Sequence, residues 1–387
     1  IIHPYFLTMR TCVVRCCSLR MIMKIFRIII LFITASLLLT SLPSCKESHH
    51  AEAKTTVVAT NFALFDLARQ AYPGDCVMLI SPGTESHDFE CTLADMATIA
   101  RAKLVVYGGG EGDDWMDDVL ARIAESGDPV PYLRAMDVIA GESELLHEAE
   151  ALESDGHDHE HDHDDGHDHD HGGEADHEAG ADHDGEADHG HGSYRDAADA
   201  ILHKNTSVYV RTSLPDTAYD GYDEHVWTDP ANAILLLHAI GDALDALGLP
   251  KNDTRAYENR LLHTDAAYRS LAQEGKLAHL LFADRFPFLY FAHAYRIAYT
   301  AAFAGCASDT EPSLATLRHL LEEMEALSPP AIYVIEFSDR RTASFLTDAH
   351  PCRVEELASG HNVTRAEFDA GVTLADLFER NLATLGR

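Results

Sequence analysis

Apolar and polar positions follow two alternating periods along the chain from residue 56 onwards. Short apolar runs rich in β-branched residues predict strands at 56–60, 76–80, 103–107, 299–303 and 331–335, with a short strand near Val354. Apolar residues spaced three or four apart predict helices at 92–102, 113–124, 312–327 and 373–382, with another through Phe345. Strands that alternate with helices are typical of parallel sheets covered by helices, so the pattern predicts an α/β fold.

Two longer helices divide this alternation into halves. Asp229 is a good N-cap and Pro230 a good first residue for a helix that ends at Gly248. A second helix of about five turns starts near Asp253. We therefore expect two parallel-sheet α/β lobes joined by a long bridging helix. The expected bounds are 55–250 for the N-terminal lobe, 251–276 for the bridging helix and 277–387 for the C-terminal lobe.

Residues 1–44 are expected to comprise upstream residues and a lipoprotein signal peptide. Lys24 and Arg27 precede an apolar run, and small residues follow it, which is the order of an export signal. Cys45 comes directly after this run, as in a bacterial lipobox, so we expect Cys45 to carry a lipid and 45–54 to form a linker. A transmembrane anchor is the alternative, because the run has about the marginal length for one.

Composition changes this picture most at residues 155–192. The whole chain has 29 Lys+Arg against 64 Asp+Glu, a net charge of −35, which argues against nucleic-acid binding. The 38 residues of 155–192 include 11 His and 15 Asp or Glu, and they lack Lys and Arg. Without large apolar side chains this segment predicts a disordered loop within the N-terminal lobe. Histidine-rich tracts bind metal ions, and a merely solvating acidic linker is the alternative.

Four cysteines remain after the first 45 residues are set aside: Cys76, Cys91, Cys306 and Cys352. They allow three disulfide pairings, and the sequence does not decide among them. Because they show no C-x-x-C spacing, the pattern does not support a cysteine zinc site.

Four polar residues lie where metal ligands are expected in an α/β protein. Ligands bind beyond the carboxyl ends of parallel strands. His87 follows the second predicted strand, Glu336 ends a buried one, His225 directly precedes a capped helix, and His361 lies in a polar loop. Their shared placement at the ends of elements predicts a metal site.

These motifs resemble a known family. The lipobox, a Pro-Gly-x-x-x-His sequence that ends at His87, an acidic His-rich loop, and the run His225-Val226-Trp227-Thr228-Asp229-Pro230 occur in this order, before a long helix. Together they resemble the metal-binding subunits of ABC-type zinc and manganese importers, the cluster A-I or TroA-like solute receptors. The resemblance implies that His87 is the first ligand and His225 the second.

The remaining ligands do not carry over directly. In the region where relatives have a His or Glu as a metal ligand, residues 282–287 of this chain read FADRFP. Asp284 therefore lies next to the position expected for that ligand. Where relatives have an Asp near the carboxyl end, this chain offers His361. We therefore expect His361 to be the third ligand, and Glu336, Asp284 or water to be the fourth.

The ligand types indicate the metal. Three imidazoles favour tetrahedral zinc, whereas Asp284 and Glu336 without His361 would favour manganese. Neutral imidazoles are needed, so affinity should fall as the pH drops through roughly 6.5. The resemblance implies a monomeric, extracytoplasmic receptor, anchored by lipid to a bacterial membrane, which delivers Zn²⁺ to an ABC permease. We expect no enzymatic activity; a metallohydrolase and a metal-dependent adhesin or extracellular binding module are the alternatives.

Overall fold

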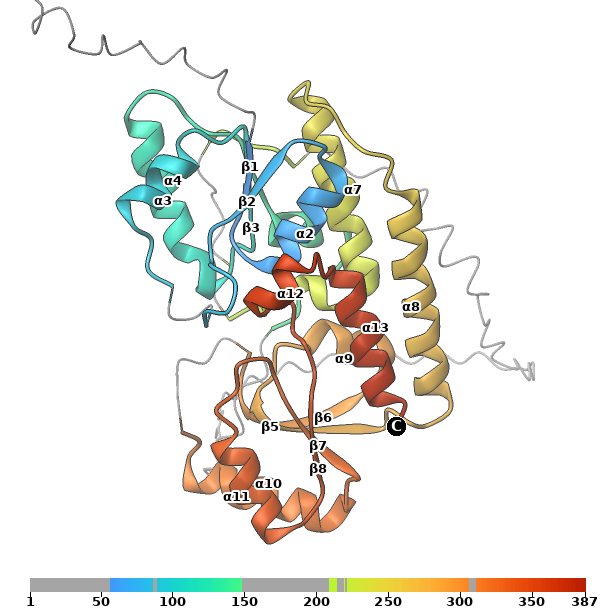
Figure 1. Ribbon diagram of the computed structural model, residues 1–387. Coiled ribbons are helices and arrows are strands. Elements are labelled where there is room, and N and C mark those ends of the chain that lie inside the picture. The colour runs from blue at the N-terminus through green and yellow to red at the C-terminus, as the bar shows by residue number, and fades with distance from the viewer. Residues whose placement is uncertain (1–55, 86–88, 148–208, 214–218, 220, 306–310) are drawn as a thin grey trace, which may run out of the picture. The chain divides into compact units, whose positions relative to one another are not determined.

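The computed structural model describes residues 56–85, 89–147, 209–213, 219, 221–305 and 311–387 (Figure 1). The predicted signal peptide with Cys45, the linker 45–54, the His-rich segment 155–192, His87 and Cys306 lie outside these residues. Cys76, Cys91 and Cys352 are free thiols. Every helix in the described part of the chain falls short, in length or in apolar content, of what a bilayer crossing requires.

The first half of the chain forms a four-stranded parallel sheet with the order β2-β1-β3-β4. Its strands are β1 (Thr56–Ala59), β2 (Asp75–Met78), β3 (Leu104–Tyr107) and β4 (Tyr132–Arg134). The helices between and after them are α2 (Phe62–Ala71), α3 (Leu93–Ile99), α4 (Asp114–Glu125) and α5 (Ala135–Glu142). The predicted start of α3 is confirmed: Thr92 and Asp95 form a reciprocal capping box.

The second half repeats this arrangement. Its parallel sheet has the order β6-β5-β7-β8. The strands are β5 (His279–Arg285), β6 (Ala298–Phe303), β7 (Ala331–Val334) and β8 (Arg353–Glu356). The helices are α9 (Leu289–Tyr295), α10 (Leu314–Leu327), α11 (Arg341–Ala349), α12 (Arg365–Asp369) and α13 (Leu374–Leu385). In both halves the second strand flanks the first, and the third and fourth follow on the other side. The predicted fold class, two parallel-sheet α/β lobes, is therefore confirmed.

Two long helices connect the sheets. Helix α7 (Pro230–Ala246) begins as predicted, with the Asp229 side chain accepting a hydrogen bond of 3.0 Å from the Ala231 amide. Helix α8 (Arg255–Gln273) packs against both α7 and α13 (Figure 1). Because α7 belongs to the first half and α13 to the second, α8 bridges the two sheets.

The halves share one hydrophobic core. It includes Phe62 of α2, Leu236 of α7, Phe282 of β5 and Phe378 of α13, all buried. Two smaller clusters cover the other faces of the sheets, under α3 and α4 in the first half and under α10 and α11 in the second. Continuous burial of apolar surface from one sheet to the other stabilises the halves against separation.

A buried carboxylate adds a polar connection between the halves. Asp66 of α2 accepts hydrogen bonds from the Tyr257 hydroxyl of α8 (2.5 Å) and from the Leu374 amide of α13 (2.8 Å). The Arg69 guanidinium, 2.6 Å away, supplies the opposite charge. A fully buried carboxylate with these partners is costly to expose or to leave unpaired, so it fixes three helices relative to one another.

The structure also contains elements that the pattern did not predict. Strand β5 was not among the predicted strands, and it contains Phe282 and Asp284. The pattern of β5 is interrupted by His279, Asp284 and Arg285, which hides its strand character. Strand β4 has only three residues, too few for a period to register.

Candidate metal centre

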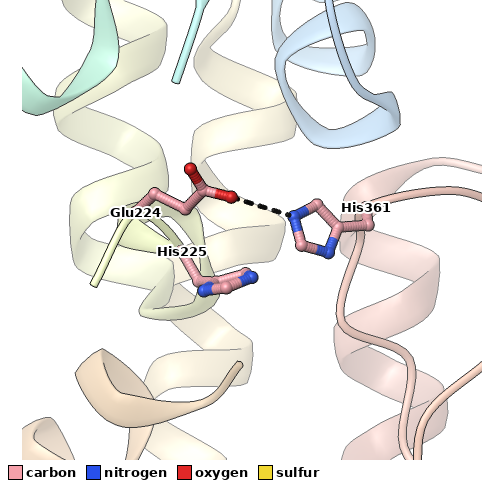
Figure 2. Close-up of side chains that lie close together, drawn as sticks. All are labelled: Glu224, His225 and His361. Carbon is pink, nitrogen blue, oxygen red and sulfur yellow. Dashed lines mark ion pairs between the residues drawn. The ribbon is translucent and has the colours of Figure 1, made fainter. Parts of the chain in front are cut away.

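Three buried side chains meet between segments that are far apart in the sequence. Glu224, His225 and His361 each offer one ligand atom, and these atoms all lie within 4.8 Å of one another (Figure 2). The His361 Nε2 lies 3.9 Å from the Glu224 Oε1. The His225 and His361 rings are 4.4 Å apart between centroids, with an interplanar angle of 73°. This geometry brings together two of the predicted site residues and adds Glu224.

The His225 ring is oriented by its neighbour Asp223. The Asp223 Oδ1 accepts a hydrogen bond of 2.7 Å from the His225 amide and lies 3.1 Å from the ring Nδ1. A carboxylate at Nδ1 selects the tautomer that carries the proton there and leaves the lone pair on Nε2. Asp223 is itself held, because its amide donates to the Leu146 carbonyl and its carbonyl accepts from the Tyr290 hydroxyl. The ring is thus set for coordination through Nε2.

Glu224 lies against the glycine-rich turn that follows β3. The Gly112 amide donates a hydrogen bond of 2.8 Å to the Glu224 Oε2. A Cβ atom at Gly110 would lie 2.4 Å from the Glu224 Cβ, and one at Gly112 would lie 2.4 Å from Oε1. Side chains at these positions would therefore displace the carboxylate. The glycine-rich turn after β3 thus receives an acidic side chain.

His361 is held by the first half of the chain through its backbone. The Phe62 amide at the start of α2 donates to the His361 carbonyl (2.8 Å), and the Ala63 amide donates to the Gly360 carbonyl (2.9 Å). These are amides that a helix leaves without internal partners, so the loop satisfies them. Gly360 has a φ of +84°, a conformation that favours glycine. The His361 ring therefore projects from a loop docked on the N-terminal half.

The other two predicted ligands occupy different positions. Glu336 is buried, and its carboxylate accepts hydrogen bonds from the Ser359 amide (2.7 Å) and hydroxyl (2.5 Å). Burial raises the pKa of Glu336, and the bonds from Ser359 oppose that shift. The Ser359 hydroxyl also accepts from the His361 amide (3.1 Å), so Glu336 supports the loop that carries His361.

Asp284 also lies apart from the three-residue cluster. Its Oδ1 accepts from the Arg285 amide (2.9 Å), whereas its buried Oδ2 has no hydrogen-bond partner among the described residues. Neither Asp284 nor Glu336 contributes a ligand atom to the group formed by Glu224, His225 and His361.

His87 lies outside the described residues, but the segment that leads to it is anchored beside His361. The Asn362 side-chain amide donates to the carbonyls of Ser81 and Thr84, both at 2.8 Å. The Gly83 amide donates to the Val363 carbonyl (2.8 Å). The loop after β2 and the loop after β8 are thus fastened to each other.

Sequence reasoning did not single out Glu224. It stands between Asp223 and His225 in an acidic run, where one of the three residues was selected as a ligand. The run itself was the available signal, since a carboxylate next to an imidazole is a common ligand pairing. The side-chain direction of Glu224 depends on the space that Gly110 and Gly112 leave for it, and no local sequence pattern reveals that contact.

The arrangement suits a divalent cation of intermediate softness. Two imidazole nitrogens and one carboxylate oxygen are ligand types that zinc accepts in a tetrahedral site, and a fourth position remains. Burial removes competing water and strengthens the attraction between the carboxylate and a cation. Fold and site thus define a two-lobed α/β metal-binding protein.

Comparison with known proteins identifies the family to which this metal-binding protein belongs. Residues 57–387 match the family described as zinc-uptake complex component A, periplasmic. The chain belongs to this family. It is 25% identical over 359 residues to the zinc-binding lipoprotein AdcA of Streptococcus pneumoniae, a match that covers 91% of this chain and 59% of that protein. The chain thus spans less than two thirds of the length of this relative.

Solved structures share the fold. The Zn(II)-bound ZnuA-like domain of Streptococcus pneumoniae AdcA superposes with a TM-score of 0.56 at 21% identity, covering 86% of this chain and 97% of that domain. The Mn-bound periplasmic metal-binding protein of Candidatus Liberibacter asiaticus gives a TM-score of 0.55 at 13% identity, covering 86% and 100%. Both the zinc-bound and the manganese-bound structure therefore have the two-lobed architecture of this chain.

Proposed function

We propose that this protein is an extracytoplasmic receptor that captures Zn²⁺ between its two lobes and delivers it to an ABC permease. The observation that carries the proposal is the convergence of Glu224, His225 and His361, with ligand atoms within 4.8 Å of one another. Membership of the zinc-uptake family and the zinc-binding name of the AdcA relative support the choice of ion. The metal is cargo, and the protein performs no chemistry on it.

The proposed ligands are His225, His361 and Glu224, with His87 completing the set. Asn362 anchors the segment before His87 beside His361, which supports a fourth ligand from that side. Three imidazoles and one carboxylate give the tetrahedral N/O coordination typical of zinc. In this proposal Glu336 positions the loop of His361.

The cellular setting belongs to the same proposal. A lipid on Cys45 would hold the receptor at a bacterial membrane beside its permease, and the AdcA relative is a lipoprotein. The acidic, histidine-rich segment 155–192 would raise the local concentration of cations and transfer them to the stronger site. The receptor acts as a monomer in this scheme.

Metal titration tests the proposal. We expect the soluble chain, without its signal segment, to bind one Zn²⁺ at high affinity and further Zn²⁺ weakly through segment 155–192, by calorimetry against a competing chelator. His225→Ala, His361→Ala, His87→Ala and Glu224→Gln should each weaken binding by at least about 100-fold. The matched control is His263→Ala, an exposed imidazole on α8. Parent-like affinity in the cluster variants would disprove the site.

Manganese is the second cargo to consider, because the site offers oxygen ligands. Glu224 is in the cluster, and the buried Asp284 Oδ2 makes no hydrogen bond to a described residue. Asp284 lies apart from the cluster, but if it moved to join Glu224 around an ion, the added oxygen ligand would suit Mn²⁺ better than zinc. Parallel titrations with Zn²⁺ and Mn²⁺ distinguish the two cargoes. If zinc is the cargo, Asp284→Asn should leave zinc affinity unchanged. If Asp284 completes a manganese site, this variant should lose tight binding of Mn²⁺.

A further inference from the structure

Two leucines on the surface are far more exposed than any other large hydrophobic side chain in the described residues. Leu93 is 84% exposed and Leu314 is 86% exposed, whereas Leu327, Phe337 and Phe345 lie between 38% and 48%. A leucine that contacts almost nothing in its own chain adds little to folding stability. A single exposed leucine is ordinary on a protein surface, so it is the repetition of this feature in both halves that points to a contact.

The two leucines occupy equivalent positions in the two halves. Leu93 is the first residue of α3, which connects β2 to β3, and Leu314 is the first residue of α10, which connects β6 to β7. The two sheets have the same strand order, so these helices correspond. Each leucine also follows a hydroxyl side chain that caps its helix, Thr92 or Ser313.

The sequences around the leucines repeat as well. Residues 90–94 read ECTLA and residues 311–315 read EPSLA, so that a glutamate stands three positions before each leucine. Both glutamates, Glu90 and Glu311, are exposed, and Glu311 also forms an exposed ion pair with Arg341 at 2.9 Å. Each half therefore presents one leucine preceded by one acidic residue.

The connections that lead to the two leucines start at the edges of the sheets that carry the metal cluster. A connection that follows a parallel strand leaves from the carboxyl edge of its sheet. The ligands lie at the same edges, since Glu224 contacts the turn after β3 and His361 follows β8. The connection to the C-terminal leucine starts at Gly305, where a Cβ would lie 3.1 Å from both Asp223 Oδ2 and His225 Cε1.

Charge identifies the kind of partner. A second copy of this chain would bring glutamates against glutamates, and both chains carry a net charge of −35. A complementary partner instead has two apolar pockets, each next to a basic side chain. The pockets are spaced so that one receives Leu93 and the other receives Leu314. A protein that takes cargo from a site between the lobes must also contact both lobes.

We propose that Leu93 and Leu314 are paired anchors for the membrane permease, each inserting into an apolar pocket flanked by a cationic residue. This inference rests on the proposed function, because it assigns the surface through which the receptor docks to deliver its ion. A leucine buried in such a pocket stabilises the complex by removing its apolar surface from water.

The test uses the full chain in the bacterium that encodes it, with the native gene replaced by Leu93→Asp, Leu314→Asp or the double variant. Aspartate is favourable in the first turn of a helix, so folding is preserved. The matched control is Leu327→Asp, at the opposite end of α10 and 44% exposed. Uptake of ⁶⁵Zn²⁺ at limiting zinc and the zinc affinity of each purified variant are measured.

We expect each anchor variant to lower uptake by about ten-fold and the double variant by more, with zinc affinity within two-fold of the parent. Raising the amount of receptor should restore uptake, because docking affinity is what was lost. Parent-like uptake by the double variant, or equal loss with Leu327→Asp, would overturn the docking surface alone. A parent chain that binds no zinc would overturn the proposed function and, with it, the choice of partner.

Discussion

The backbone carbonyl of His361 accepts a 2.8 Å hydrogen bond from the amide of Phe62, a residue 299 positions earlier in the chain. One of the metal-binding imidazoles in the proposed site is thus carried by the second half and positioned by the first. The same junction holds Gly360 through the Ala63 amide. The site is therefore supported by backbone contacts that do not involve the ligand atoms, and its supporting residues can be tested separately from its ligands.

Asp223→Asn tests the orientation of His225. The substitution removes the negative charge beside Nδ1 and with it the preference for the tautomer that exposes Nε2. We expect zinc affinity to fall about 10–100-fold, as is usual for residues that orient a ligand. Competition calorimetry measures the change. Asp253→Asn, which alters an exposed pair with Arg255, should leave affinity unchanged; equal effects of the two variants would refute the orienting role.

Gly110→Ala tests whether the space beside Gly110 and Gly112 positions the Glu224 side chain. The added Cβ would lie 2.4 Å from the Glu224 Cβ, so the carboxylate must move and zinc affinity should fall by about ten-fold or more. Gly241→Ala is the control, because its Cβ meets open space within helix α7. That variant should gain about 0.5–1 kcal/mol in stability and keep parent-like zinc binding. Unchanged affinity in Gly110→Ala would show that Glu224 is not a ligand.

Asn362→Ala tests the link between the loop of His361 and the segment before His87. It removes two hydrogen bonds to backbone carbonyls, so we expect a loss of about 1–3 kcal/mol in stability together with weaker zinc binding. Tyr268→Phe removes a buried bond to the Phe378 carbonyl between α8 and α13 and should lower stability without changing zinc affinity. Urea unfolding and zinc titration of both variants give the comparison. Parent-like affinity in Asn362→Ala would remove the support for His87.

Asp229→Asn tests a pH effect on folding. Burial raises the pKa of Asp229 to about 7, and the charge of Asp265 adds to that shift. Since the folded state binds this proton more tightly than the unfolded state, the stabilisation is complete below about pH 4. It is lost as the pH rises through about 7. Asparagine keeps the helix cap but does not titrate.

The zinc-free variant should therefore be more stable than the parent at pH 8, by about 1–4 kcal/mol, and similar to it at pH 4. Urea unfolding at pH 4, 6 and 8 measures this difference. A difference between the two proteins that stays constant over this range would show that Asp229 does not titrate there.

The sequence predicted most of the fold because local signals and tertiary structure agree there. Asp229 and Pro230 predicted the start of α7, and Thr92 with Asp95 predicted the start of α3, since capping depends on neighbouring residues. Strand β5 was not predicted, because Asp284 and Arg285 interrupt its apolar run. The metal site was predictable only in part. His225 and His361 stood out at the ends of elements, whereas the direction of Glu224 depends on a tertiary contact with glycines 112 or more positions away.

The loop of His361, docked on the first turn of α2, has a consequence for the timing of transport. In the proposed receptor, the loop of His361 is held by hydrogen bonds from the Phe62 and Ala63 amides of the other half, so a bound ion would dissociate slowly while that junction stays intact. Docking on the permease would then have to separate the two segments before zinc can leave.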